Sequence, residues 1–212
     1  MSRTRATAAV AVVLGLGIAT LSACSSDTSQ DAAAKPITKA LDQGEITQAL
    51  PGAGEVLSGW EPYKGKRVAS DGTVCAGSQS KSSPTGWVRA GSAWFTYEGS
   101  TNNMMDVDIC LYDTPENSKA AYAAWKGAES SKEKAPEEPV GEDSAFVVNP
   151  GKSEDTIYAF SRSGNVNLRV KIEGAGADTT GVHDVLAATL KRLQQVQDGD
   201  RATATAADQA KK

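Results

Sequence analysis

Alternation of apolar and polar residues is the clearest pattern in the chain, and it is typical of β-strands that bury one face. It is most regular in residues 104–112, where the apolar positions are Met105, Val107, Ile109 and Leu111. From this pattern and the flanking turn residues, we expect strands at residues 68–74, 93–97, 104–112, 145–148, 156–161 and 166–172. The connecting loops 99–103 and 163–165 are short, which predicts antiparallel hairpins.

Apolar residues recur at helical spacing in other segments. The strongest stripe lies near the C-terminus and contains Val182, Val185, Leu186, Thr189, Leu190, Leu193 and Val196. A second helix is expected to begin at Thr114-Pro115-Glu116 and to end at Gly127. Its first residues combine a hydroxyl cap, a proline and an acid, which is typical of a helix start. One or two short helical turns are expected within residues 37–50. Together these elements predict one α+β domain over residues 37–197, in which an antiparallel sheet carries helices mainly on one face.

The two flanks of this domain lack both patterns. Residues 24–36 are small and polar, so we expect a flexible tether. Residues 198–212 read DGDRATATAADQAKK and are expected to form a disordered, solvated tail.

The N-terminus has a third kind of pattern. Arg3 and Arg5 precede the apolar residues 6–20, and the run Leu21-Ser22-Ala23-Cys24 follows them. The apolar stretch is shorter than the roughly 20 residues that a spanning helix needs. The arrangement resembles a bacterial lipoprotein signal with its lipobox. The resemblance implies that residues 1–23 are a signal peptide and that Cys24 carries the lipid. The protein would then be anchored to the cell membrane, facing the outside of the cytoplasm.

The charge balance narrows the choice of partners. The chain has 22 Lys and Arg against 26 Asp and Glu, for a formal net charge of −4. Without Arg3 and Arg5, 20 basic residues would face 26 acidic ones, for a charge of −6. Nucleic-acid binding needs a basic stripe that replaces counterions, so we expect no nucleic-acid partner. The same balance argues against electrostatic docking on anionic headgroups, which leaves the N-terminal lipid as the membrane contact.

Cys75 and Cys110 form an even pair in a chain that resembles an exported protein. A disulfide between them is expected in an oxidising compartment, and two buried free thiols are the alternative. Such a bridge is worth roughly 4 kcal/mol in the chain-entropy model. Two cysteines without a CxxC motif and a single histidine do not make a tetrahedral set, so we expect no metal and no other cofactor.

The candidates for catalysis are few. No GxSxG motif occurs, and the only histidine, His183, stands at the start of a helix without a triad around it. Asp106 and Asp108 share one strand face and could act as paired carboxylates on sugars. A solvated outer face explains the same alternation. An envelope hydrolase that uses this pair is therefore an alternative to a non-enzymatic protein.

Aromatic residues suggest a ligand site. Trp60, Tyr63 and Trp87 occur in segments with Gly and Pro neighbours that read as irregular. Aromatic rings in such segments can line a groove for an apolar or sugar-like ligand. Alternatively, they cap the ends of the core.

A family resemblance covers residues 45–197. It rests on a series of short motifs: Leu50-Pro51, Gly59-Trp60, Asp113-Thr114-Pro115, Ala120-Ala121-Tyr122, Val140-Gly141-Glu142-Asp143-Ser144 and Arg162-Ser163-Gly164-Asn165-Val166. The chain is similar to actinobacterial envelope lipoproteins whose domain resembles the extracellular sensor domains of receptor serine/threonine kinases. That resemblance implies an α+β domain with a disulfide and a cleft, and it supplies no catalytic residues. We therefore expect a non-enzymatic module that binds an unknown envelope ligand or protein. An accessory subunit of a membrane complex is a further alternative.

Overall fold

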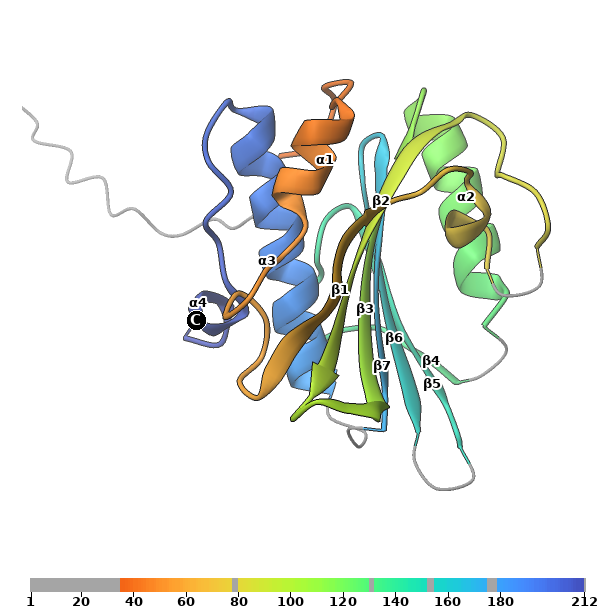
Figure 1. Cartoon of the computed structure of the whole chain (residues 1–212). Coiled ribbons are helices and arrows are strands. Elements are labelled where there is room, and N and C mark those ends of the chain that lie inside the picture. The colour runs from red at the N-terminus through yellow and green to blue at the C-terminus, as the bar shows by residue number, and fades with distance from the viewer. Residues whose placement is uncertain (1–34, 78–79, 130–131, 152–154, 175–178, 212) are drawn as a thin grey trace, which may run out of the picture.

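The computed structural model describes residues 35–77, 80–129, 132–151, 155–174 and 179–211. The signal segment, Cys24 and most of the expected tether therefore lie outside the described residues. The described part is built on one seven-stranded antiparallel sheet, with the order β1-β2-β3-β7-β6-β5-β4 (Figure 1). Its strands are β1 (Trp60–Val68), β2 (Trp87–Tyr97), β3 (Ser100–Tyr112), β4 (Lys132–Lys134), β5 (Asp143–Asn149), β6 (Thr156–Ser163) and β7 (Val166–Glu173).

Helices lie on both sides of this sheet (Figure 1). The helical elements are α1 (Gln43–Ala49), the 3-10 helix η2 (Thr73–Cys75), α2 (Pro115–Gly127), α3 (Thr179–Gln197) and α4 (Ala206–Gln209). Helices α1, α3 and α4 lie on one side, and α2 lies on the other. The α+β class and the antiparallel sheet are confirmed, and most of the helical residues pack on one face as the sequence predicts.

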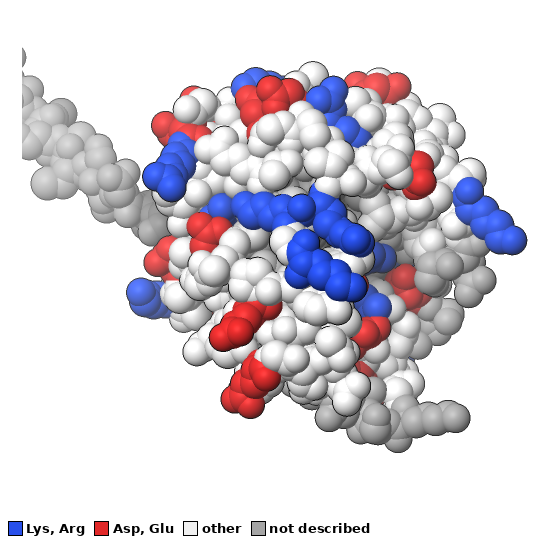
Figure 2. All heavy atoms as spheres, viewed as in Figure 1, with Lys and Arg blue, Asp and Glu red and all other residues white. Residues whose placement is uncertain are grey.

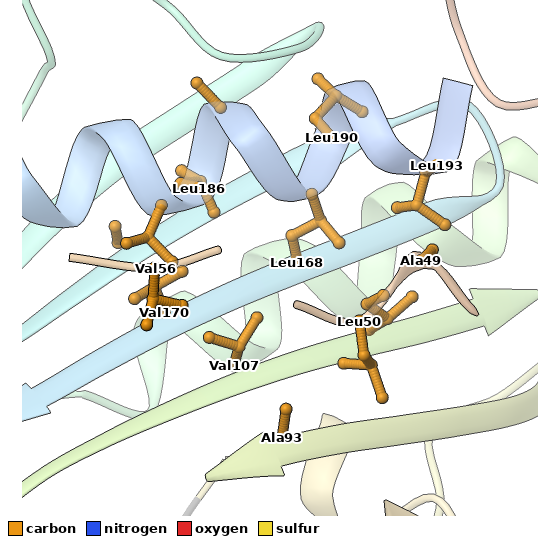
Figure 3. Close-up of a cluster of buried hydrophobic side chains, with 14 of the residues drawn as sticks. Ala49, Leu50, Val56, Ala93, Val107, Leu168, Val170, Leu186, Leu190 and Leu193 are labelled. Atoms are coloured by element: carbon orange, nitrogen blue, oxygen red, sulfur yellow. The ribbon is translucent and has the colours of Figure 1, made fainter. Parts of the chain in front are cut away.

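The main core fills the space between the sheet and helices α1 and α3. Figure 3 shows Leu186 of α3 near Val170 of β7 and Leu193 of α3 near Leu50. These side chains and that of Leu190 are almost fully buried. Burial of a leucine side chain contributes about 1.5–3 kcal/mol. The stripe that the sequence shows at helical spacing is therefore the stripe that holds α3 on the sheet.

A smaller second core lies under α2. Trp125, Tyr122 and Phe160 belong to it, and so does the disulfide between Cys75 and Cys110. The structure thus contains the bridge expected from the sequence, and it attaches η2 to β3, a strand inside the sheet.

The strand at the sheet edge differs from the expectation. The sequence predicts an irregular segment around Trp60 and a strand at residues 68–74, whereas β1 runs over Trp60–Val68 and η2 follows it. Most residues of β1 are exposed because it has a neighbour on one side only. Its apolar residues therefore do not alternate with polar ones. Together with the charged run from Lys64 to Arg67, this is why the sequence pattern does not predict a strand there. Lysines on an edge strand also hinder pairing with another chain.

The C-terminal segment differs as well. Residues 198–211 are not a solvated tail in the structure, because they fold back along α3 and end in α4. Gly199 adopts a positive φ of 85°, which lets the chain reverse after α3. Ala202, Ala204 and Ala206 are buried there. Small alanines carry too little apolar area for this packing to be visible in the sequence pattern.

Candidate functional site

Helix α2 covers only part of the second sheet face. Near its start, Ser118 donates a hydrogen bond to Asn167 of β7, and Trp125 lies near its end, with its ring 4.8 Å from the Arg169 guanidinium. The helix ends at Gly127. The strands β2, β3, β7 and β6 continue past the C-terminal end of α2. On that part of the second sheet face, no helix among the described residues packs.

Four side chains form a row across these uncovered positions, which we call the open row. It consists of Trp94 in β2, Asp106 in β3, Lys171 in β7 and Tyr158 in β6. Each is the direct cross-strand partner of the next, so all four point to the same face of the sheet. All four are partly exposed. The structure therefore aligns two charged residues between two aromatic residues on one accessible surface.

Close contacts hold the members of the open row in place. The Lys171 ammonium lies 4.0 Å from an Asp106 carboxylate oxygen, and it also pairs with Glu173. The same ammonium lies 5.9 Å from the centre of the Tyr158 ring. At the other end, the Arg67 guanidinium lies 4.3 Å from the centre of the Trp94 ring. These cation–π contacts limit how far the rings and the cations can move.

A buried ion pair between Asp108 and Arg169 lies next to the open row, two residues along β3 and β7 on the same face of the sheet. Both carboxylate oxygens of Asp108 accept hydrogen bonds, one from Ser92 Oγ at 2.5 Å and the other from Arg169 Nε and Nη2 at 3.0 and 2.7 Å. Asp108 is 1% exposed, so water does not replace these bonds. A paired and saturated charge of this kind fixes the strands on which the row stands.

The environment changes the acidity of two members of the row. Burial, followed by the nearby Asp108 carboxylate, raises the pKa of Asp106 to about 6. Burial, followed by the Glu129 carboxylate, raises the pKa of Tyr158 to about 12. At neutral pH the row therefore presents a phenol and a carboxylate that accepts a proton under mildly acidic conditions.

The two carboxylates considered for catalysis are not equivalent. Asp106 is partly exposed, whereas Asp108 is buried and bonded to Ser92 and Arg169. A pair that divides acid and nucleophile roles needs both carboxylates beside the substrate. In this geometry Asp106 is accessible to a substrate, and Asp108 supports the strand.

The aromatic residues singled out in the sequence are not brought together. Trp60 is 6% exposed, lies in the main core and contacts the Tyr97 ring at 5.6 Å. Trp87 packs at the other end of β2 against the second core, on the opposite face. Tyr63 is on the edge strand β1, where Lys64 lies 4.8 Å from its ring centre. One groove therefore cannot contain all three rings.

Sequence reasoning identified Asp106 but missed the other members of the open row. The sequence does indicate that Lys171 faces away from the main core, because it alternates with the apolar residues Val170 and Ile172. Trp94 and Tyr158 fall within the strands predicted at residues 93–97 and 156–161, but nothing in the sequence marks them as site residues. Alternation shows that these residues face outward on their strands, but it does not show which strands are neighbours.

His183 lies at the start of α3, as its place in the sequence indicates. Its Nε2 is 3.0 Å from the carbonyl oxygen of Glu138, and its ring packs near Phe146. It borders a cavity of about 460 Å³ that α4 also lines. Among the described residues, no group of three or more His, Cys, Asp or Glu side chains is placed to hold a metal ion.

Comparisons with known proteins support the fold. Fold and site together define an α+β domain with a partly uncovered sheet face, and this fold is similar to the extracellular domain of PknH from Mycobacterium tuberculosis. The similarity has a TM-score of 0.53 at 13% identity, and it covers 76% of this chain and 98% of that one. No family model matches the chain, and no curated protein matches it. Within the described residues, no helix is long and apolar enough to cross a membrane.

Proposed function

We propose that the protein is a non-enzymatic, lipid-anchored binding module that holds a ligand or a partner on the open row, outside the cytoplasm. The observation that carries this proposal is the alignment of Trp94, Asp106, Lys171 and Tyr158 on an uncovered part of the sheet. The similarity to the extracellular domain of a kinase is compatible with a sensor-like role.

The physical properties of the row suit recognition. Three inter-strand spacings of about 4.8 Å place Trp94 and Tyr158 about 14 Å apart, which is wide enough for an extended ligand. The rings offer apolar area, and Asp106 and Lys171 offer an acceptor and donors. Because neighbouring charges and rings already hold these side chains, little conformational entropy is lost on binding.

The proposal is tested with the full-length protein in detergent. The double variant Trp94→Ala/Lys171→Ala is compared with wild type in pull-downs from envelope extracts, with identification of bound lipids, glycans and proteins. Glu116→Ala/Lys119→Ala is the matched control, because both residues are exposed on α2 away from the row. We expect wild type and control to retain a component that the open-row variant loses, while all three melt at similar temperatures.

Tyr63 and Trp87, which do not share a groove, are tested separately in the same assay. If either Tyr63→Ala or Trp87→Ala loses the bound component and Trp94→Ala/Lys171→Ala keeps it, the ligand lies at that aromatic residue and the open-row proposal is wrong. Trp60→Ala is less informative, because Trp60 is part of the main core.

A hydrolase remains the alternative function. The observation that favours it is the raised pKa of Asp106, about 6, since a general acid works best with a pKa near the working pH. We expect no turnover of ester, peptide or glycan substrates by the wild type. Hydrolysis that Asp106→Asn abolishes would establish the enzyme class instead.

A further inference from the structure

A separate cavity on the other side of the sheet gathers positive charge. It has a volume of about 330 Å³ and lies where α1, β1 and the segment after α3 meet. Its walls contain three cations, Lys66, Arg192 and Arg201, and one carboxylate, Glu55. These residues come from four separate parts of the chain, so only the folded protein assembles them.

Backbone carbonyl groups fix two of the cations. Lys66 Nζ donates to the carbonyl oxygens of Thr47 and Leu50 at 3.1 and 2.7 Å. Arg192 is 2% exposed and donates to carbonyl oxygens that include those of Ala49 and Ala204. The carbonyls at the end of α1 attract cations through the helix dipole. They hold the two side chains in place but carry no net charge that would neutralise them.

The single carboxylate leaves an excess of positive charge. Glu55 pairs with Arg192 at 3.0 Å. Arg201 is exposed and forms no ion pair with any described residue. Burial, followed by the repulsion from Arg192, lowers the pKa of Lys66. An anion in the cavity would relieve this repulsion. It would accept hydrogen bonds from Arg201 and from the remaining N–H of Lys66. The N–H groups of Arg192 are directed at four carbonyl oxygens and at Glu55, so Arg192 would contribute its charge.

We propose that this cavity binds a phosphate group. A phosphate offers several acceptor oxygens and a charge of up to −2, which matches the excess of the three cations over Glu55. Lysine serves such sites as a point charge, and arginine donates directed hydrogen bonds. The site is distinct from the open row and goes beyond the proposed function.

The surface around the cavity favours the approach of anions. Figure 2 shows Lys and Arg side chains gathered in a band over the region of β1, on a protein whose net charge is negative. On β1, Lys64 and Lys66 are exposed, whereas Arg67 lies over the Trp94 ring at the open row. Such a local positive field raises the concentration of anions at the cavity even when the whole molecule is acidic.

Two sources can supply this chemistry, a soluble phosphate compound and the headgroup of an anionic phospholipid. The full-length protein in neutral detergent is titrated with inorganic phosphate and with phenyl phosphate, and binding is followed by calorimetry and by the melting temperature. Sodium chloride at the same ionic strength is the reference. Flotation with phosphatidylcholine vesicles that contain or lack phosphatidylglycerol tests the headgroup, with the Cys24→Ser variant in place of the lipidated chain.

Variants separate the cavity from the surrounding band. We expect Arg201→Gln and Lys66→Met each to weaken binding at least tenfold, whereas Lys64→Met, on the same strand but outside the cavity, changes it less than threefold. Arg201→Gln is the decisive variant, because Arg201 makes no ion pair that folding of the described part depends on. Saturable binding of phosphate or phenyl phosphate without flotation identifies a soluble ligand, and flotation alone identifies a headgroup. No response beyond that to chloride, or equal binding by Arg201→Gln and wild type, would overturn the proposal.

Discussion

At the scale of single residues, Asp106 and Asp108 show how position decides the chemistry of identical side chains. They are two residues apart on one face of β3. Asp108 is fully bonded to Ser92 and Arg169, whereas Asp106 faces Lys171 at 4.0 Å and is desolvated beside the Asp108 charge. One carboxylate therefore supports the sheet, and the other is available on the surface.

The raised pKa of Asp106 predicts a pH-dependent stability difference. Its folded pKa is about 6, against about 4 in an unfolded chain, so the folded state binds the proton more tightly. This contribution to stability is fully present below pH 4 and is lost as the pH rises through 6. We expect Asp106→Asn to be more stable than wild type by roughly 1–3 kcal/mol at pH 8, and not at pH 4. Urea denaturation at both pH values measures this difference.

The control for this prediction is Glu98→Gln, which changes an exposed carboxylate at the tip of the β2–β3 hairpin. It should leave stability within about 0.5 kcal/mol of wild type at both pH values. An Asp106→Asn effect of equal size at pH 4 and pH 8 would show that the folded protein does not perturb Asp106.

At the scale of elements, the segment after α3 stabilises a distant part of the fold. The Ala206 N–H donates to the carbonyl of Glu55, and Ala204 supplies a carbonyl to buried Arg192. Thr205 caps α4 through a reciprocal pair of bonds with Asp208. The segment thus satisfies the Glu55 carbonyl in the turn between α1 and β1 and part of the Arg192 side chain in α3.

Removal of residues 199–212 should therefore destabilise the domain. The deletion takes away the Ala204 carbonyl that the buried Arg192 side chain bonds and the Ala206 N–H that donates to Glu55, and unpaired buried polar groups cost about 1–3 kcal/mol each. We expect a loss of at least about 2 kcal/mol in the free energy of unfolding by urea. Removal of Lys211 and Lys212 alone is the matched control and should change stability by less than about 0.5 kcal/mol. Equal stability of the two truncated proteins would mean that the segment is a tail without a structural role.

At the scale of the whole molecule, the N-terminal segment carries the prediction of where the protein is located. The basic start, the short apolar stretch and Cys24 predict export and acylation. Cys24→Ser should leave the membrane fraction or stay unprocessed, and an alkyne fatty acid should label the wild type only. Cys110→Ser, which removes the disulfide but keeps the signal, should still be labelled. Equal labelling of wild type and Cys24→Ser would rule out this mode of attachment.

The sequence by itself determined the regular elements that bury one face. Apolar residues at strand spacing around Val107 and at helical spacing through Leu190 are the residues that become buried. The sequence could therefore predict strands β2, β3, β5, β6 and β7 and helices α2 and α3. The pairing of Cys75 with Cys110 was predicted from a different signal, an even pair of cysteines in a chain whose N-terminus resembles an export signal. The lipid at Cys24 stays a prediction from the sequence.

Only the tertiary structure decided what lies beside what. Periodicity shows that Lys171 faces away from the main core, but it cannot show that Asp106 and Tyr158 are its neighbours, since strand order depends on long-range pairing. Strand β1 and the C-terminal segment were missed for a related reason, because exposed edge residues and small alanines leave no apolar pattern. The open row and the cationic cavity both consist of residues far apart in the chain, so their chemistry exists only once the sheet and α3 are in place.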